Sequence, residues 1–328
     1  MYPLVSIVVL NWNGENLIED CISSINELNY KNLEVIVVDN NSTDKSLKII
    51  SNFPDVKLIQ NSSNIGFAAG MNIGIKNSKG KYIATLNNDV EVDRDWLKRP
   101  IEILESNDSI GIISCRQMIY GQKDKNDVIY NYMNHYLLPQ PEYKEFHFNS
   151  NLTNKEGYVF SASGASAIYR KAMLNKIGLF DERFFAYHEE SDLHTRALFH
   201  AWKCFFVPSS VVFHKGSKSF NKMSPTFHYF HERNRWWYIW KNFPLSIIIT
   251  NAVWLILMEL RIFRVIAFKS KCPMVYLKAK YDSLRGLYQF TPERKSVKVN
   301  AKKKKEIIKL FLKYKTPIVS DHYFEHIT

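Results

Sequence analysis

The sequence contains few cysteines, and none of them is close to another. Four cysteines occur among 328 residues, and no two of them form a C-x-x-C motif. This spacing excludes a disulfide framework and argues against a zinc site, which needs clustered thiolates or imidazoles. We therefore expect ordinary reduced thiols, as in an intracellular protein, at Cys21, Cys115, Cys204 and Cys272.

Long uncharged apolar runs and targeting signals are also lacking. A multi-span transporter needs repeated stretches of about 20 apolar residues, and such stretches are nearly absent. The first residues, MYPLVSIVVLNWNG, have no basic region and turn polar after one strand's length, so we do not expect a signal peptide. A hydrophobic content of 46% excludes a disordered tail protein, and no internal repeat is visible.

Positive charge is concentrated at one end of the chain. Residues 1–260 contain 27 Lys and Arg and 27 Asp and Glu. Residues 261–328 contain 17 Lys and Arg against 5 Asp and Glu, which accounts for the whole formal net charge of +12. A nucleic-acid-binding protein usually carries its basic face on the folded module. We therefore expect no nucleic-acid partner, and a different anionic partner for the tail.

The first 115 residues alternate between strand and helix patterns. Strands are predicted at residues 5–10, 33–39, 56–60, 82–86 and 110–114, and helices at residues 17–28, 67–75 and 96–105. A further helix through residues 47–50 is predicted to have Ser42 or Thr43 as its cap. This alternation predicts an α/β fold whose mostly parallel sheet is covered by helices on both faces.

Regularity is lost between residues 116 and 158 and then resumes. We expect the polar, aromatic-rich stretch to be an inserted loop or hairpin near a substrate site, because long irregular segments in compact domains are often functional. After it, strands are predicted at 160–169 and 205–213, and helices at 171–177 and 189–202.

The character of the chain changes after residue 219. Aromatic residues crowd positions 227–240, positions 246–260 are strongly apolar, and basic tracts follow up to Lys302–Lys305. We therefore divide the chain into a catalytic domain, 1–219, and a helical extension, 220–328. One interpretation of the extension is an interfacial anchor on an anionic membrane surface. The other is a helical pair packed on the first domain, with a solvated charged tail.

Polar side chains follow four successive predicted strands. These are Asn11 and Asn13, then Asp39, Asn40 and Ser42, then residues 61–66, and finally Asn87, Asn88 and Asp89. In an open parallel sheet, ligands bind at the carboxyl ends of the strands. Any one of these groups is typical of a turn or a helix cap, but together they predict a pocket that binds a nucleotide.

Six motifs give the chain a family resemblance. They are VSIVVLNWNG, VIVVDNNSTD, NIGFAAGMNIGI, LNNDVEV, SGASAIYRKAMLNKIGLFDERFFAYHEESDLHTRAL and PSSVVFHKGSKS. In this order, over about residues 3–220, they resemble the inverting family 2 glycosyltransferases of the GT-A fold, and most closely the rhamnosyltransferase-like branch. The resemblance implies transfer of a sugar from a nucleotide-sugar donor.

The resemblance also implies which residues meet the donor nucleotide. Asp39 would accept hydrogen bonds from the base or ribose, and Asn11, Asn13, Asn40 and Ser42 would line the same pocket. Asn64, Gly66, Phe67 and Asn72 would close over the nucleotide. Glycine there permits close backbone approach, and the start of a helix favours phosphate.

A divalent cation, Mg²⁺ or Mn²⁺, is implied by the position of Asn87-Asn88-Asp89, which is that of the family's D-x-D motif. Here Asp89 is the carboxylate ligand, while Asn87 and Asn88 would contact the donor. His214 resembles the histidine that the family often adds as a metal or phosphate ligand. Lys215 and Lys218 would neutralise the diphosphate, or belong to a solvated loop.

The segment His188-Glu189-Glu190-Ser191-Asp192 resembles the family's acidic pair before a helix. A carboxylate beside another carboxylate has a raised pKa, which suits a base that deprotonates an acceptor hydroxyl. The resemblance assigns this role to Glu190, with Glu189 as the competitor and Asp192 as a helix cap. The alternative is a helix start carrying acids that match its dipole.

Small residues and one tryptophan complete the candidate site. Gly164 and Ala165 resemble the family's small-residue turn beneath the sugar, although a tight entry into a strand explains them equally well. Trp202 either stacks on the acceptor or packs in the core.

Together these features predict an inverting transferase that uses a dTDP-sugar, dTDP-rhamnose first, or a UDP-hexose. The expected acceptor is a saccharide or lipid-linked saccharide of a surface polysaccharide. The expected location is cytoplasmic and peripheral, on the inner face of the cell membrane. Two alternatives stay open: another nucleotide-sugar enzyme such as a nucleotidyltransferase, and a non-catalytic module that binds membrane surfaces.

Overall fold

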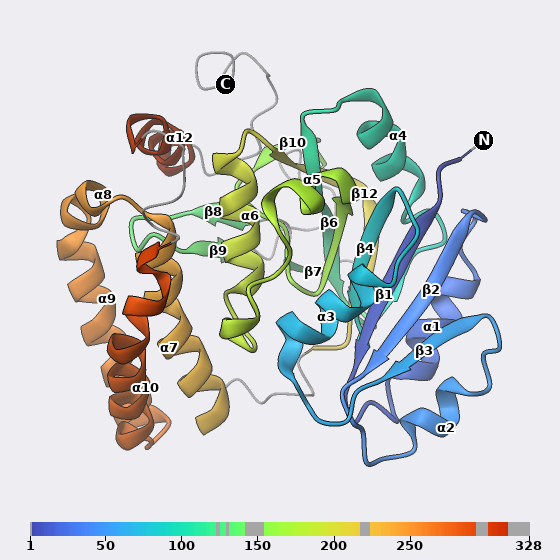
Figure 1. Cartoon of the computed structure of the whole chain (residues 1–328), viewed down its shortest axis with the longest axis horizontal. Helices are drawn as coiled ribbons and strands as arrows, with labels where there is room; N and C mark the ends of the chain where they lie inside the picture. The colour runs from blue at the N-terminus through green and yellow to red at the C-terminus, as the bar shows by residue number, and fades with distance from the viewer. Residues whose placement is uncertain are drawn as a thin grey trace.

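One mixed β-sheet forms the centre of the computed structural model, which describes residues 2–122, 125–128, 131–141, 154–216, 224–292 and 301–313. The strands follow the order β10-β12-β6-β11-β4-β1-β2-β3 (Figure 1). Two short strands lie outside this path, since β5 pairs with β12 and β7 pairs with β6. The strands are β1 Val5–Asn11, β2 Leu33–Asp39, β3 Val56–Gln60, β4 Tyr82–Asn87, β5 Val90–Val92, β6 Ile110–Ile119, β7 Asn126–Val128, β10 Gly157–Val159, β11 Ser166–Arg170 and β12 Lys203–His214.

Both faces of the sheet are covered by helices. Strand β1 pairs in parallel with β2 and β4, and its alternating side chains enter two separate cores. Val5, Ile7 and Val9 join the core that includes α1 (Ile18–Asn26) and α4 (Lys98–Ser106). Val8 joins the core that includes α3 (Gly66–Lys76), α5 (Lys171–Ile177) and α6 (Glu189–Phe199). The predicted α/β fold, with a mostly parallel sheet between helices, is confirmed.

Two pairings in the other half of the sheet bring distant segments together. Strand β11 runs antiparallel between β4 and β6, and the amide of Asn87 donates to the carbonyl of Ala165 at 3.1 Å. Strand β12 is parallel to β6 and antiparallel to the short strand β5, with His214 opposite Val90. The end of β12 therefore lies directly beside the turn that follows β4.

One cap was predicted wrongly. Helix α2 (Ser46–Ile50) begins later than expected, and the Asp44 side chain, not that of Ser42 or Thr43, accepts the Ser46 amide at 3.0 Å. Ser42 is engaged elsewhere, because its hydroxyl donates to Asp39 at 2.6 Å. Asp44, two residues before the helix, therefore binds the first helical amide in place of the predicted cap.

The stretch from 116 to 158 is partly regular. Strand β6 extends through it to Ile119, and β7 folds back on β6. Strands β8 (Asn131–Met133) and β9 (Pro139–Pro141) form the expected hairpin as a separate two-stranded sheet. Strand β10 then returns to the main sheet beside β12.

The C-terminal helices gather at the end of the molecule opposite β3 (Figure 1). They are α7 Pro225–Asn242, α8 Leu245–Thr250, α9 Ala252–Arg264, α10 Pro273–Gly286 and α12 Ala301–Lys313. Helix α7 packs against both α6 and α10. The apolar stretch 246–260 is two helices, separated at Asn251. Among the described residues, no helix has the length and apolar character needed to cross a membrane.

The lysine-rich segment near residue 302 is also part of the folded structure. Helix α12 buries Ile307 and Ile308, and the Lys304 ammonium lies 4.8 Å from the centre of the Phe199 ring of α6. The described part of the tail therefore packs on the first domain. The second interpretation of the extension expected such packing for its helices.

Candidate functional site

A cavity of about 320 Å³ opens at the carboxyl ends of β1, β2 and β4. Residues from the ends of all four predicted strands, β3 included, and from the two later motifs line this one space. The predicted residues among them are Asn40, Asn64, Gly66, Phe67, Asn87, Asn88, Asp89, Gly164, Ala165, Glu189, Glu190 and His214. The fold therefore brings these predicted residues together, and Asp89 and Glu190 line the same cavity.

A buried network of side chains supports the cavity from behind. Asn11 donates to Asp39 at 2.8 Å, and Asn88 donates to the Asn11 amide oxygen at 2.8 Å. Gly14 makes this contact possible, since a Cβ there would lie 2.3 Å from both the Asn11 oxygen and the Asn88 nitrogen. The network fixes the loops after β1 and β4 relative to each other.

Four of the residues predicted to touch the nucleotide do not line the cavity. Asp39 is fully buried, and its carboxylate accepts the Ser42 amide at 2.9 Å as well as the Ser42 hydroxyl. Asn13 is exposed, and its backbone amide donates to the Ser42 hydroxyl at 2.9 Å. Asn11, Asn13, Asp39 and Ser42 thus tie the loops after β1 and β2 together, because their polar atoms find partners in one another.

The start of α3 is already capped by protein. Gly66 has φ of +86°, which favours glycine. The Gly66 amide donates to the Asn64 side chain at 3.0 Å, and the amides of Phe67 and Ala68 donate to the carbonyl of Phe185 at 2.6 and 3.2 Å. The expectation of a phosphate at this helix start was therefore wrong for this structure, because a carbonyl oxygen occupies the position.

Asn72 and Trp202 do not line the cavity, and for Trp202 this favours the second of its two predicted roles, packing. Asn72 lies on the far side of α3, where it donates to the Phe180 carbonyl and to Glu182, both at 2.9 Å. Trp202 follows the C-terminal end of α6, whereas the cavity lies at its N-terminal end, and the Lys176 ammonium sits 6.0 Å from the tryptophan ring centre. Both residues pack structural elements together.

Asp89 and His214 form the most polar part of the cavity. His214 Nε2 lies 3.3 Å from Asp89 Oδ2, and His214 Nδ1 lies 2.7 Å from Asp127 Oδ2. Burial alone lowers the pKa of His214, but the hydrogen bonds to Asp127 and Asp89 outweigh it and raise the pKa to about 9. The second Asp89 oxygen, Oδ1, is buried and has no hydrogen-bond partner among the residues that the structure describes.

These residues offer a cation two ligands and not a complete cage, and His214 would have to lose a proton before Nε2 could bind the ion. Within the described ranges, no group of three or more His, Cys, Asp or Glu side chains is arranged to hold a metal. Mg²⁺ is commonly bound by one or two carboxylates together with substrate phosphates. The unpartnered oxygen of Asp89 is the feature that such an ion would satisfy.

Of the two predicted lysines, the one that the structure describes, Lys215, does not add to this site. Lys215 forms ion pairs with Asp20 and with Glu91, the latter at 2.7 Å. Its charge is therefore committed to two carboxylates and is not free for a diphosphate. Lys218 lies outside the described residues.

Glu189 and Glu190 begin α6 and turn into the cavity. The Glu190 side chain packs on Gly164, where an added Cβ would lie 3.3 Å from its Cγ. Burial, and then the neighbouring charge of Glu190, raise the pKa of Glu189 well above its usual range. Burial raises the pKa of Glu190 as well, while a hydrogen bond from Glu189 lowers it. Burial thus raises the pKa of both carboxyls, and the pair holds a proton more readily than two separate exposed glutamates would.

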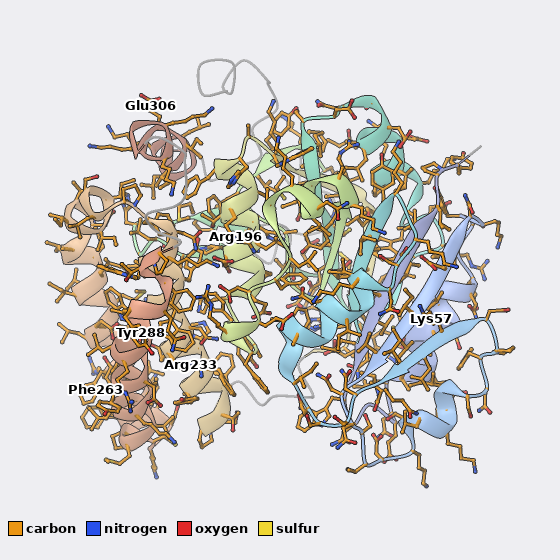
Figure 2. The ribbon with its side chains drawn as sticks, in the orientation of Figure 1. Lys57, Arg196, Arg233, Phe263, Tyr288 and Glu306 are labelled. Atoms are coloured by element: carbon orange, nitrogen blue, oxygen red, sulfur yellow. The ribbon has the colours of Figure 1, made fainter. Side chains whose placement is uncertain are left out.

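The third acidic residue of this motif has a different use. Asp192 accepts hydrogen bonds from Arg196 at 2.8 Å, and from Lys241 and Asn242 of α7 at 2.9 Å each. Burial raises the pKa of Asp192, but Lys241 and Arg196 outweigh it and lower the pKa. Figure 2 shows Arg196 on α6, in the middle of the molecule. The motif therefore divides into a cavity-facing pair and a structural ion pair.

Sequence reasoning missed several residues that line the cavity. They are Leu10, Trp12, Gln117, Asp127, Val128, Ser163, Phe185, Ala186 and Tyr187. For Asp127 and Val128 the signal was the irregular stretch 116–158, which was expected near a substrate site. The others belong to quoted motifs or to strand β6, and no pattern distinguished them from core or loop residues.

The sequence profile described as Glycosyl transferase family 2 matches residues 6–178, more than half of the chain. An uncharacterized glycosyltransferase of Rickettsia prowazekii is 29% identical over 212 residues, which are 64% of this chain and 61% of the relative. The chain spans between 39% and 61% of the length of the first curated relatives that it matches.

Solved structures agree on the fold. S. aureus TarS 1–349 in complex with UDP-GlcNAc superposes with a TM-score of 0.57 at 19% identity, covering 94% of this chain and 88% of TarS 1–349. The mannosyltransferase PcManGT of Pyrobaculum calidifontis, in complex with GDP-Man and Mn²⁺, gives 0.55 at 14% identity, covering 96% and 88%. The fold is that of the GT-A glycosyltransferases, and with the profile match it shows that this chain belongs to glycosyl transferase family 2.

Proposed function

We propose that this protein is an inverting glycosyltransferase that moves a sugar from a nucleotide-sugar donor onto a saccharide or lipid-linked saccharide. The observation that carries the proposal is one cavity lined both by the Asp89–His214 pair and by the Glu189–Glu190 pair. The first pair suits a diphosphate leaving group, and the second suits proton removal from an acceptor. A nucleotidyltransferase or a binding module has no need for the second pair.

Asp89 and His214 are the residues that would hold Mg²⁺ or Mn²⁺. When bound, the ion neutralises charge on the departing nucleotide diphosphate. The proposal is supported by the unpartnered Asp89 oxygen and by the Mn²⁺ present in the Pyrobaculum mannosyltransferase. The amides of Asn87 and Asn88 line the wall beside them, where they can bind donor hydroxyls.

Glu190 is the proposed base. In a single displacement, it takes the proton of the acceptor hydroxyl while that oxygen attacks the anomeric carbon on the face opposite the nucleotide. The neighbouring Glu189 favours this role, because its hydrogen bond lowers the pKa of Glu190 against the effect of burial. Gly164 leaves the space that the Glu190 side chain fills, and Ala165 continues this wall of the cavity.

The proposed donor is a UDP-hexose or dTDP-rhamnose. TarS supports a UDP-sugar, since it was crystallised with UDP-GlcNAc. The resemblance to the rhamnosyltransferase-like branch supports dTDP-rhamnose and a role in surface polysaccharide synthesis. Asn40 and Asn64, whose amides meet at 3.3 Å, form the polar wall that we assign to the nucleotide.

The protein is further proposed to sit on the inner face of the cell membrane through its C-terminal helices. Most of the large apolar side chains that are exposed in the described residues lie on these helices. They are Leu245, Ile249, Val253, Trp254, Ile256, Leu257, Leu260, Phe263, Phe268, Met274, Leu277, Tyr281, Leu284 and Tyr288. Figure 2 shows Phe263 and Tyr288 among them. The proposed contact with the membrane is made by α8–α10. It is not made by Lys302–Lys305, because α12 is packed on the core.

Replacing Glu190 with glutamine is expected to abolish transfer and spare donor binding. The amide keeps the shape of the side chain and cannot accept the proton, so the transfer rate should fall by about 100-fold or more. Product formation from UDP- and dTDP-sugars measures the rate, and calorimetry measures nucleotide affinity. Glu19→Gln, on the exposed side of α1, is the control. Transfer by Glu190→Gln at the wild-type rate would contradict the proposed base.

Activity is expected to fall in mildly acidic solution. The base must be ionised, and burial raises the pKa of Glu190 above its usual 4.5. The rate should therefore decline as the pH falls through a value higher than 4.5. The dependence of kcat on pH measures this, with nucleotide binding followed at each pH as the control. An acidic limb below 4.5 would argue against a buried carboxyl as the base.

Replacing Asp89 with asparagine is expected to remove the effect of metal on nucleotide affinity. The wild type should bind UDP or dTDP at least about 10-fold more tightly with Mn²⁺, because an ion held by Asp89 would neutralise charge on the diphosphate. In Asp89→Asn the nucleotide affinities with and without Mn²⁺ should agree within about 3-fold. Asp55→Asn, an exposed change, should behave as the wild type. A metal effect that survives in Asp89→Asn would place the ion elsewhere.

Removing apolar surface from α9 is expected to weaken membrane binding. Replacing Leu257 and Leu260, which are 50% and 62% exposed, with glutamine should lower affinity for phosphatidylglycerol vesicles by at least about 10-fold. Sedimentation with vesicles measures the affinity. Tyr2→Gln with Tyr120→Gln is the matched control, since both side chains are exposed outside the C-terminal helices. Unchanged vesicle binding by the leucine variant, or a wild-type dimer that covers this face, would overturn the assignment.

A further inference from the structure

The loop that leads into the glutamate pair has an unusual backbone. Phe185, Tyr187 and His188 have φ angles of +66°, +70° and +70°, although none is glycine. Such conformations cost about 1–3 kcal/mol each and persist only where surrounding contacts enforce them. The loop therefore depends on contacts from outside its own segment.

Asn234 of α7 supplies these contacts. Its side chain is fully buried, and Nδ2 lies 2.7 Å from the carbonyls of Phe184 and Ala186 and 2.9 Å from that of Tyr187. Its own oxygen accepts a hydrogen bond from Arg233 Nε at 2.9 Å. One amide group thus lies within hydrogen-bond distance of three carbonyls of the loop, of which that of Phe184 also accepts the Ala186 amide at 2.8 Å.

Arg233 fixes the amide in place. Its Nη2 donates to the Phe184 carbonyl at 3.1 Å, and its guanidinium lies 4.2 Å from the centre of the Trp237 ring. Figure 2 shows Arg233 on α7, the helix that runs beside α6. The orientation of Asn234 is therefore set by a neighbouring donor, which directs its NH₂ group toward the loop.

The same loop connects the two walls of the cavity. The Phe185 carbonyl accepts the amides of Phe67 and Ala68 at the start of α3, and Ala186 and Tyr187 line the cavity. Glu189 follows directly. A shift of this loop would move the glutamate pair relative to the wall assigned to the donor.

We propose that Asn234 is a positioning residue for the glutamate pair, so that α7 completes the active site. The inference rests on the proposed function, in which Glu190 is the base. Helix α7 lies beyond the residues 6–178 that the family profile matches. Asn234 touches only backbone carbonyls of the loop, and acts by holding Glu190 at the distance that the reaction needs. Residues 1–219 alone would lack this support.

The test compares the same chemical change at two buried amides. In Asn234→Asp, a carboxylate replaces the donor group and faces three carbonyl oxygens. In Asn251→Asp, the change falls on an amide that is 7% exposed and donates to the Ile247 carbonyl at 2.9 Å, away from the loop. Transfer rate, nucleotide affinity and thermal unfolding are measured on each full-length protein, with rates expressed per folded molecule.

The expected result separates kcat from binding. A misplacement of about 1 Å costs on the order of 100-fold in rate, so kcat of Asn234→Asp should fall by about 30-fold or more. Its affinity for UDP or dTDP should stay within about 3-fold of the wild type. Asn251→Asp should keep kcat within about 2-fold, even if it unfolds at a lower temperature. Equal kcat per folded molecule in both variants would overturn the proposal.

A milder variant keeps the test decisive if Asn234→Asp does not fold. Arg233→Met retains an apolar side chain over Trp237 and loses both donors, to Phe184 and to Asn234. Its kcat should fall by about 3- to 10-fold with unchanged nucleotide affinity, and an unchanged kcat would contradict the positioning role. A wild type that transfers no sugar would contradict the proposed function itself, whereas an active wild type with a fully active Asn234 variant would contradict only this inference.

Discussion

The antiparallel pairing of β12 with β5 is the contact on which the polar end of the cavity depends. It sets His214 opposite Val90, and the amide of Lys215 donates to the Asp89 carbonyl at 2.9 Å. Two residues far apart in the sequence are thereby held by backbone hydrogen bonds and not by their side chains alone. The Asp89 and His214 side chains are therefore placed before any ligand arrives, which spares the binding step the entropy of ordering them.

Much of this arrangement follows from the sequence, and the limits have physical causes. Apolar runs closed by polar residues identified the strands and the edge of the sheet at which Asp89, Asn87 and Asn40 meet. The pattern did not show which polar side chains bind other parts of the protein and not the cavity. Asp39 accepts hydrogen bonds from Ser42 and Asn11, and Asn72 donates to a carbonyl on another segment. Such partners come from distant elements, whose approach depends on packing.

The first turn of α6 illustrates the same limit on a smaller scale. Successive helical residues point about 100° apart, so neighbouring acids face different surroundings. Glu189 and Glu190 enter the cavity, while Asp192 turns toward α7 and meets Lys241. One acidic motif therefore supplies both the carboxyls of the cavity and the anchor of the next helix. The family resemblance predicted a role for the first group, and only the fold reveals the second.

The ion pairs between α6 and α7 have a consequence for how the chain folds. Asp192 is fully buried, and Lys241 and Asn242, two of its partners, are carried by α7. Breaking a buried ion pair by removing one partner costs about 3–5 kcal/mol, a large part of the stability of an ordinary domain. The cooperative folding unit therefore reaches at least to residue 242, well past residue 178, where the match to the family profile ends.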